Sequence, residues 1–575
     1  MRPFMFLLLL GILSAVAMPA AAQTYTVGDT ITVIQRPLIN IPSIVRPGDM
    51  LTVSCDADPQ TTSWTAALER DGLVVPLSIG TAVYSPSTLW WTLSITTPDV
   101  PVFDLYDLHV TADFGLDDVT NHSVKVVPEF RSQFEVVHIT DTHIPTYLYY
   151  YQSGADTDST TSMALRAITE DINIINPEFV LLTGDFMNEG ELEDYLDKKY
   201  YSRSMMHLNE FEMPIYVTAG NHDIGGWNDT PPSDGKARRD WWKFYGWKRL
   251  DNPPPGAPAY TQDYSFDYRD IHFVGLEAYD NYDSWRFSIY GAESFTNMQM
   301  SWLQADIAAA SGSSRVVLFH HNDFQNELDL SGLGVDLALY GHAHSDIEDS
   351  SYPMNVRTDN AGGTNRPFRV VKFDGSAISA RPTLSAQNPT TLEVVYAPGN
   401  DGSVPEVTAQ VFNGHPVSFP HGLLRVSMPG GARGYTASGG VLTQVNDTGD
   451  HAVCYVEVNI PANGYVFVTV NADTSTATST PVTPATRLLG AAPNPFNPRT
   501  EIAFELATAG HCRVTVFDVR GHELDVLIDE QRSTGRHTIA WNGCDAAGRA
   551  QPSGTYFVGL RAGSYVETRK VVLAR

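Results

Sequence analysis

Five apolar segments between residues 134 and 340 each run into a residue of the type that binds metal ions. They are five to seven residues long and rich in Val, Ile, Leu and Phe. Segments of this length and composition predict buried β-strands. The segments are residues 134–140, 179–183, 215–219, 315–319 and 335–340.

Helical patterns lie between these predicted strands. A stripe of apolar residues precedes the second strand, at Ala164, Leu165, Ile168, Ile172 and Ile175. Thr296 and Gln299 form a capping box in front of a predicted helix through Ile307. Strands that alternate with helices predict an α/β sandwich, here over residues 131–383.

The flanking regions have all-β patterns. Residues 24–128 alternate in the manner of an immunoglobulin-like sandwich, and residues 384–472 are again β-rich. A Thr/Pro linker at 473–486 precedes a last small sandwich at 487–575. We therefore expect a multidomain chain in which all-β, Ig-like sandwich domains flank an α/β sandwich. The role of residues 24–128 is either to present substrate or to act as a spacer, and we favour the spacer role.

The N-terminus predicts export. Residues 1–22 have a positive start, an apolar stretch and small residues before Gln23, so we expect a signal peptide cleaved near Ala22. The apolar stretch is too short to span a bilayer comfortably, and no transmembrane segment is expected elsewhere. The expected location is outside the cell, on its surface or in the periplasm of a Gram-negative-type bacterium.

Charge and cysteine content narrow the range of partners. The formal net charge is −29, which argues against a nucleic-acid scaffold role. Four cysteines are too few for a disulfide framework. Cys512 and Cys544 share a domain, and they form either a bridge or two free thiols.

The strand ends carry the candidate chemistry. In open α/β sheets, ligands bind beyond the carboxyl ends of the strands, so these side chains can converge. Asp, Asn and His without thiolate suit first-row metals, with Fe, Mn or Zn expected. Seven ligands are too many for one tetrahedral ion and fit two divalent or trivalent ions. The candidate ligands are Asp141, His143, Asp185, Asn221, His320, His342 and His344.

The order of these motifs, D-x-H, G-D, G-N-H-D, H and G-H-x-H, resembles the calcineurin-like metallophosphoesterase superfamily over residues 131–383. The resemblance implies hydrolysis of phosphate esters by a hydroxide that bridges two metal ions. It also implies one metal on Asp141, His143 and His344, a second on Asn221, His320 and His342, and Asp185 as the bridge between them.

Three further positions follow from the resemblance. His222 is expected to face the phosphoryl group and donate a proton to the leaving alkoxide, or else only to position Asn221. His320 is preferred to His321 because the family ligand is the first His after the strand, although Asn322 replaces the usual Pro. Asn188 stands where relatives carry a tyrosine or aspartate, and its side-chain amide is expected to orient His222.

The last sandwich carries a second resemblance. Residues 494–498 (Asn-Pro-Phe-Asn-Pro) open it, and Gly535, Trp541 and Gly554 mark its later turns. The motif order resembles the FlgD-like immunoglobulin fold and the C-terminal sorting modules of type IX secretion. This module would contact secretion machinery or the cell surface, or it is a passive terminal domain.

The substrate is expected to be an anionic phosphoester. Residues 236–249 carry six positive charges and one negative among aromatic residues. This segment either overhangs the metals as a lid or packs its aromatic face on the sheet, and the same two alternatives apply to Tyr147–Tyr151. The sequence does not separate a monoesterase from a diesterase or nuclease. The rival hypothesis is a cell-surface adhesion protein with a structural metal domain.

Overall fold

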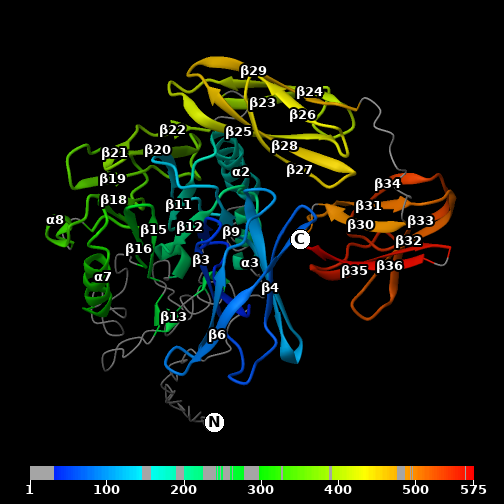
Figure 1. Ribbon diagram of the computed structural model, residues 1–575, viewed down its shortest axis with the longest axis horizontal. Helices are drawn as coiled ribbons and strands as arrows, with labels where there is room; N and C mark the ends of the chain where they lie inside the picture. The colour runs from blue at the N-terminus through cyan, green and yellow to red at the C-terminus, as the bar shows by residue number, and fades with distance from the viewer. Residues whose placement is uncertain are drawn as a thin grey trace, which may run out of the picture. The chain divides into compact units, whose positions relative to one another are not determined.

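The protein is described by a computed structural model over residues 32–144, 157–188, 200–224, 241, 244–246, 248–249, 260–261, 263–277, 297–324, 328–386, 391–474, 486–492, 494, 496–563 and 565–574. Contacts divide the chain into two compact units, Met1–Ala472 and Asp473–Arg575 (Figure 1). Among the described residues, no helix has the length and apolar character to cross a bilayer. The predicted signal peptide, Tyr147–Tyr151, Thr296 and most of the Thr/Pro linker lie outside the described residues.

The first part of unit 1 consists of two β-sheets that share one apolar core. Their strand orders are β1-β3-β7-β6 and β2-β9-β8-β4-β5. Alternate residues point inward, so that Leu51, Val53 and Cys55 are buried against Leu68 and Leu93. The strands are β1 (Ile34–Arg36), β2 (Ser43–Val45), β3 (Met50–Cys55), β4 (Thr65–Arg70), β5 (Leu73–Leu77), β6 (Ile79–Ser85), β7 (Trp90–Thr96), β8 (Leu105–Ala112) and β9 (Leu116–Val126), with a short 3-10 turn at Asp113–Gly115.

The middle of unit 1 contains two further sheets. One has the order β12-β11-β10-β20-β21, with β22 paired to β20, and the other has the order β15-β16-β17-β18-β19. The strands of these two sheets are β10 (Gln133–Ile139), β11 (Phe179–Thr183), β12 (Ile215–Thr218), β15 (Tyr264–Tyr268), β16 (Ile271–Gly275), β17 (Arg315–Phe319), β18 (Leu337–Tyr340), β19 (Met354–Arg357), β20 (Pro367–Asp374), β21 (Ala377–Ala380) and β22 (Leu384–Ser385). The remaining elements are α2 (Thr157–Ile175), α3 (Tyr200–Leu208), α4 (Asn221–Ile224), α7 (Asn297–Ala309), α8 (Leu330–Leu333) and the hairpin of β13 (Lys248–Arg249) and β14 (Tyr260–Thr261).

Strand alternation sorts the apolar residues of these sheets into separate cores. Val136 of β10 and Val317 of β17 belong to one core shared by the two sheets. Val137 faces the other way, toward the apolar stripe of α2 that the sequence predicts. Leu318 belongs to a core that includes Leu303 of α7. Each residue's place in a strand therefore fixes which layer its side chain meets.

The last part of unit 1 has the sheets β23-β24-β29-β26 and β25-β28-β27. Their apolar residues join the same core as α2, which packs on β25 and β23 (yellow in Figure 1). The strands are β23 (Leu392–Ala397), β24 (Glu406–Asn413), β25 (Phe419–Pro429), β26 (Tyr435–Ser438), β27 (Val441–Asp447), β28 (His451–Ile460) and β29 (Gly464–Ala472).

Unit 2 has its own core around Trp541 and Phe496. Its sheets have the orders β30-β31-β34 and β33-β32-β35-β36. None of the four cysteines forms a disulfide in the structure, so Cys512 and Cys544 are not bridged. The strands are β30 (Arg487–Ala492), β31 (Thr500–Leu506), β32 (Gly510–Phe517), β33 (Glu523–Arg532), β34 (Gly535–Trp541), β35 (Gly554–Ala562) and β36 (Tyr565–Leu573).

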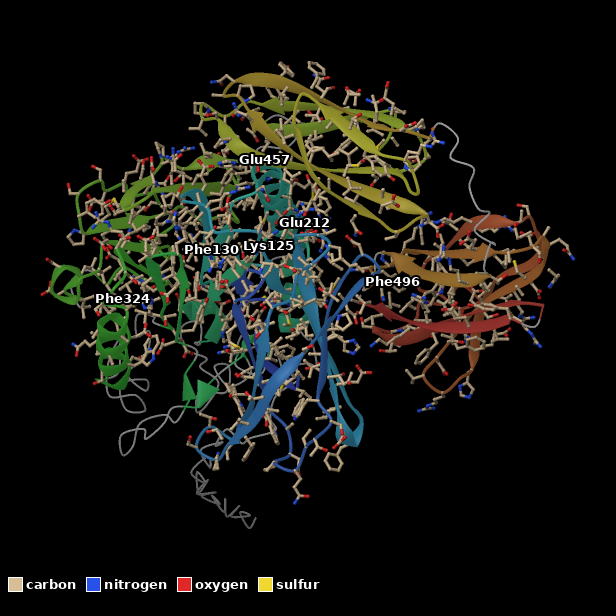
Figure 2. All side chains as sticks on the ribbon, in the orientation of Figure 1. Lys125, Phe130, Glu212, Phe324, Glu457 and Phe496 are labelled. Carbon is tan, nitrogen blue, oxygen red and sulfur yellow. The ribbon has the colours of Figure 1, made fainter. Side chains whose placement is uncertain are left out.

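A buried ionic junction joins the three parts of unit 1. It consists of Arg70, Asp104, Lys125, Glu212 and Arg425, which come from all three parts (Lys125 and Glu212 are labelled in Figure 2). Asp104 lies 3.4 Å from Arg70 Nε, 3.7 Å from Lys125 Nζ and 3.4 Å from Arg425 Nη2. Both arginines also pair with Glu212, which precedes β12.

The charge of Asp104 depends on these partners. Its side chain is 1% exposed and also accepts a 2.6 Å hydrogen bond from Tyr455 Oη. Burial alone would raise the pKa of Asp104, but Arg425, Arg70 and Lys125 together hold it well below its usual range. A buried carboxylate of this kind stabilises the protein only while its cations are in place.

We predict that Asp104→Asn destabilises unit 1 by about 3–5 kcal/mol, because it leaves three partly buried cations without the buried carboxylate that they share. Thermal or urea unfolding measures the loss. Asp99→Asn, at an exposed acid of the same region, is the control and should change stability little. Equal stability of the two variants would show that the junction does not hold the parts together.

Candidate metal centre

The candidate ligands follow strands of both central sheets. In one sheet, β10, β11 and β12 are parallel neighbours and lead into Asp141, Asp185 and Asn221. In the other sheet, β17 and β18 are parallel neighbours and lead into the His320–His321 pair and His342. Parallel strands bring their carboxyl ends to one edge, which is the expected place for a site in such sheets.

The ligand loops have an unusual backbone conformation. Asp141, His143, Asp185, His342 and His344 all have positive φ, between 46° and 68°. Residues with a Cβ rarely adopt this left-handed conformation, and each instance costs on the order of 1–2 kcal/mol. Strain of this kind concentrates at functional sites, where the surrounding structure holds it in place.

The first group of side chains is Asp141, His143 and His344. Asp141 Oδ1 lies 3.2 Å from His344 Nε2 and 3.7 Å from His143 Nε2, and the two Nε2 atoms are 3.1 Å apart. Asp141 is fully buried, whereas the His344 side chain is 45% exposed. Two imidazole nitrogens and a carboxylate oxygen that converge in this way form a ligand set for one cation.

The second group is Asp185, His321 and His342. Asp185 Oδ2 lies 3.0 Å from His321 Nε2, and His342 Nδ1 lies 3.3 Å from the same His321 nitrogen. His321 Nδ1 donates a 2.8 Å hydrogen bond to the Thr183 carbonyl, which can only accept. The hydrogen on Nδ1 leaves Nε2 to carry either a second proton or a cation beside Asp185.

In this geometry His321, and not the predicted His320, lies beside Asp185, while the buried His320 Nε2 has no hydrogen-bond partner among the described residues. His320 Nδ1 lies 2.8 Å from the Asn322 carbonyl, and its ring stacks on Tyr340 with the centroids 6.0 Å apart. Alternation along β17 explains the difference, because His321 continues the side of Val317 and Phe319, which faces the other sheet. His320 continues the side of Leu318, which belongs to the core that includes Phe324.

Asn221 and His222 begin the short helix α4 at the same edge. Asn221 is 5% exposed, and its Oδ1 accepts no hydrogen bond in the described structure. A buried carbonyl oxygen without a partner is costly, and a metal ion at this position would satisfy it. The expected ligand set, with His321 in place of His320, therefore fits two cations chemically.

The backbone, not the side chain, of Asn188 orients His222. His222 Nδ1 lies 2.6 Å from the Asn188 carbonyl oxygen, so it donates the hydrogen and Nε2 faces the site. His222 N–H donates to Asp185 Oδ1 at 2.9 Å, and its Nε2 is 4.0 Å from Asp185 Oδ2. The predicted amide contact from Asn188 is replaced by one that almost any residue at position 188 could make.

Asp223, which is not among the predicted site residues, ties two ligand loops together. Its carboxylate accepts hydrogen bonds from the backbone N–H groups of Met187 at 2.8 Å, Gly220 at 2.8 Å and Phe186 at 3.3 Å. Burial, with the nearby Asp185 charge, raises the pKa of Asp223 to about 7. Its place in the G-N-H-D motif was the signal that could have found it.

Carboxylates dominate the electrostatics of the centre. Burial disfavours the His321 cation, but Asp185 and Asp141 outweigh burial and raise the pKa of His321 to about 9. Close partners hold the pKa of Asp185 below its usual range despite its burial. The two carboxylates therefore stabilise positive charge at the position where the ligand atoms converge.

Part of the basic segment 236–249 packs in the interior. Trp241 and Tyr245 are fully buried, with ring centroids 3.9 Å apart, in the core that covers β11 and β12. For these two residues the structure favours packing over a lid. Most of the charged residues of the segment, Lys236 to Asp240 and Lys243, lie outside the described residues.

Residues 134–346 match the family model for calcineurin-like phosphoesterases. At the level of the family, the match implies a dinuclear metal-dependent phosphoester hydrolase, and every candidate ligand lies within the matched residues. No curated protein matches the chain.

Several solved structures are similar to the chain at low identity. A dimetal phosphatase from Danio rerio has 15% identity over 44% of this chain and 99% of its own, with a TM-score of 0.29. PorZ, a type-IX secretion component of Porphyromonas gingivalis, has 12% identity over 37% of this chain and 29% of its own, with a TM-score of 0.13. β-Glucuronidase 3 of Bacteroides uniformis has 9% identity over 92% of this chain and 75% of its own, with a TM-score of 0.22.

We predict that Gly220→Ala abolishes metal binding at the second group, because the added Cβ would overlap Asp185 Oδ1 and the Asp185 backbone nitrogen. Metal content after reconstitution, measured by elemental analysis, checks this. Gly312→Ala is the matched control, since its Cβ would meet nothing within 4 Å. Full metal content in Gly220→Ala would contradict the close approach of these two loops.

Proposed function

We propose that the protein is a metal-dependent phosphoesterase with two ions at the edge of the central sheets. The observation that carries this proposal is the convergence of the two ligand groups, which a third cluster of His143, Asp185 and His222 joins. The family match of residues 134–346 supports the same reaction class. Bound ions would supply an activated water at neutral pH and neutralise charge on the phosphoryl oxygens.

The residues divide into two ligand sets and a bridge. Asp141, His143 and His344 would hold one ion. Asn221, His321 and His342 would hold the other, and Asp185 would serve both. Oxygen and imidazole ligands without thiolate suit Fe, Mn or Zn.

His222 is the proposed proton donor to the leaving alkoxide. The Asn188 carbonyl fixes its Nδ1–H, so a second proton would sit on Nε2, which faces the ligand cluster. The ring of His222 also meets the ring of His143 edge-on, with centroids 4.8 Å apart. These contacts hold the His222 ring at the edge of the ligand cluster.

The substrate class is tested by comparing p-nitrophenyl phosphate with bis-p-nitrophenyl phosphate, each with Mn, Fe, Zn or no added metal. A preference for the first identifies a monoesterase, and a preference for the second identifies a diesterase. Hydrolysis of neither ester by a protein that holds two ions per chain would contradict the proposed function.

We predict that Asp185→Asn lowers phosphoesterase activity by at least about a hundredfold, because a carboxylate that contacts both ions is lost. Elemental analysis of the same variant should show fewer than two ions per chain. Asp99→Asn serves as the charge-matched control and should keep both ions and full turnover.

For His222→Ala we expect both ions to remain while turnover falls, most strongly for esters with poor leaving groups, which need a proton most. Rates across a series of aryl and alkyl phosphates measure this dependence. Loss of metal in His222→Ala would instead assign His222 to the ligands.

We also propose that the chain is exported and that unit 2 directs sorting or surface attachment. This rests on the signal-peptide pattern of residues 1–22 and the motif order of residues 487–575. The compactness of unit 2 by itself is compatible with this role.

A chain that ends at Asp473 should keep its phosphoesterase activity, because every candidate ligand lies between Asp141 and His344. It should also remain in the periplasm while the full chain reaches the surface or medium. Activity in cell fractions measures both. Identical localisation of the two chains would make unit 2 a passive domain.

A further inference from the structure

A fully buried histidine, His138, lies below the ligand cluster and is not one of its ligands. It belongs to β10, three residues before Asp141, and its exposed fraction is 0%. It lies on the same side of β10 as Phe134 and Val136, which face the core between the two central sheets. A polar ring therefore ends the apolar inter-sheet core at the edge where the ligands gather.

Both ring nitrogens of His138 contact threonine hydroxyls. Nε2 lies 2.8 Å from Thr183 Oγ1, and Nδ1 lies 2.7 Å from Thr358 Oγ1. Thr183 ends β11, and Thr358 directly follows β19 in the opposite sheet. The imidazole is thus a polar bridge between the two sheets that supply the ligands.

Through Thr183, His138 is connected to the second ligand group and to Asp141. The Thr183 carbonyl accepts hydrogen bonds from His321 Nδ1 at 2.8 Å and from Thr140 Oγ1 at 2.9 Å. Thr140 Oγ1 also lies 2.7 Å from Asp141 Oδ2. Thr183 is therefore a common anchor for a ligand from each group, and Asp185 follows it by two residues.

On the other side, the bridge leads to the loop of His344. Arg369, the cross-strand partner of His138, donates from Nε to Thr358 Oγ1 at 3.0 Å. Its Nη2 donates to Asp346 Oδ1 at 2.9 Å, two residues after His344. Because Thr358 Oγ1 accepts from Arg369, its own hydrogen is available to His138 Nδ1, which leaves the ring proton on Nε2 for Thr183.

We propose that His138 is a positioning residue of the metal centre, because it fixes the Thr183 anchor of His321 relative to the loop of His344. The proposal rests on the metal centre of the proposed function and not on its phosphoesterase activity, because the effect is read as metal binding. Burial, reinforced by the Arg369 cation, lowers the pKa of His138 to about 3, so the bridge stays neutral. Hydrogen-bond partners outside the ligand shell typically change metal affinity about 10–100-fold when they are lost.

The test uses the mature protein loaded with Co²⁺, whose visible spectrum reports ligand geometry. His138→Leu should weaken binding of one Co²⁺ ion by about 10–100-fold and alter its spectrum. His138→Gln, which can still reach a threonine hydroxyl, should recover part of the Co²⁺ affinity and part of the wild-type spectrum. Thr183→Val removes the same contact from the threonine side and should also weaken Co²⁺ binding. If His138→Leu does not fold, Thr183→Val takes its place in the test.

Val136→Ala is the control for loss of stability. It lies on the same strand and face, is fully buried, and removes only apolar volume. It should lower the unfolding temperature without changing Co²⁺ affinity or spectrum. The proposal is overturned if Val136→Ala changes them as much as His138→Leu, or if His138→Leu and Thr183→Val leave them unchanged.

The two hypotheses fail in different ways. Wild-type protein that binds two Co²⁺ ions but hydrolyses no phosphoester would contradict the proposed function, and the variants would still decide the role of His138. Wild-type protein that binds no Co²⁺ would overturn both.

Discussion

The buried carboxylate of Asp185 is the constraint on which the centre depends. It is 2% exposed and lies within 4.0 Å of three imidazole rings, from His143, His222 and His321. A carboxylate removed from water requires compensating positive charge. The neighbouring loops meet this requirement only by close approach. For this reason a side chain at Gly184 or Gly220 would overlap backbone or ligand atoms. The left-handed backbone at Asp185 and four other ligand positions belongs to the same arrangement.

This arrangement also depends on the regions around the central sheets. The ionic junction joins Glu212, ahead of the strand that leads to Asn221, to Arg70 and Arg425 of the flanking parts. Buried ion pairs of this kind contribute little net stability, but removing one partner is costly. The ion pairs therefore tie the first and last parts of unit 1 to the segment that precedes β12.

The sequence was sufficient for much of the site. Apolar segments that end in Asp, Asn or His predicted the strands, and parallel pairing then brought Asp141, Asp185 and Asn221 to one edge. His320 was chosen by analogy, whereas alternation along β17 would have selected His321. The carbonyl contact of Asn188 could not be predicted, because a backbone acceptor leaves no mark on residue type. Two further contacts could not be predicted either, because they join residues far apart in the sequence. His138 and Thr358 are 220 positions apart, and Asp104 and Arg425 are 321 positions apart.

Anomalous scattering from crystals of the metal-loaded protein would locate the metal ions directly. We predict two anomalous peaks on either side of the Asp185 carboxylate, with His321 in contact with one and Asp141, His143 and His344 around the other. A single peak, or a second ion held by His320 instead of His321, would contradict it.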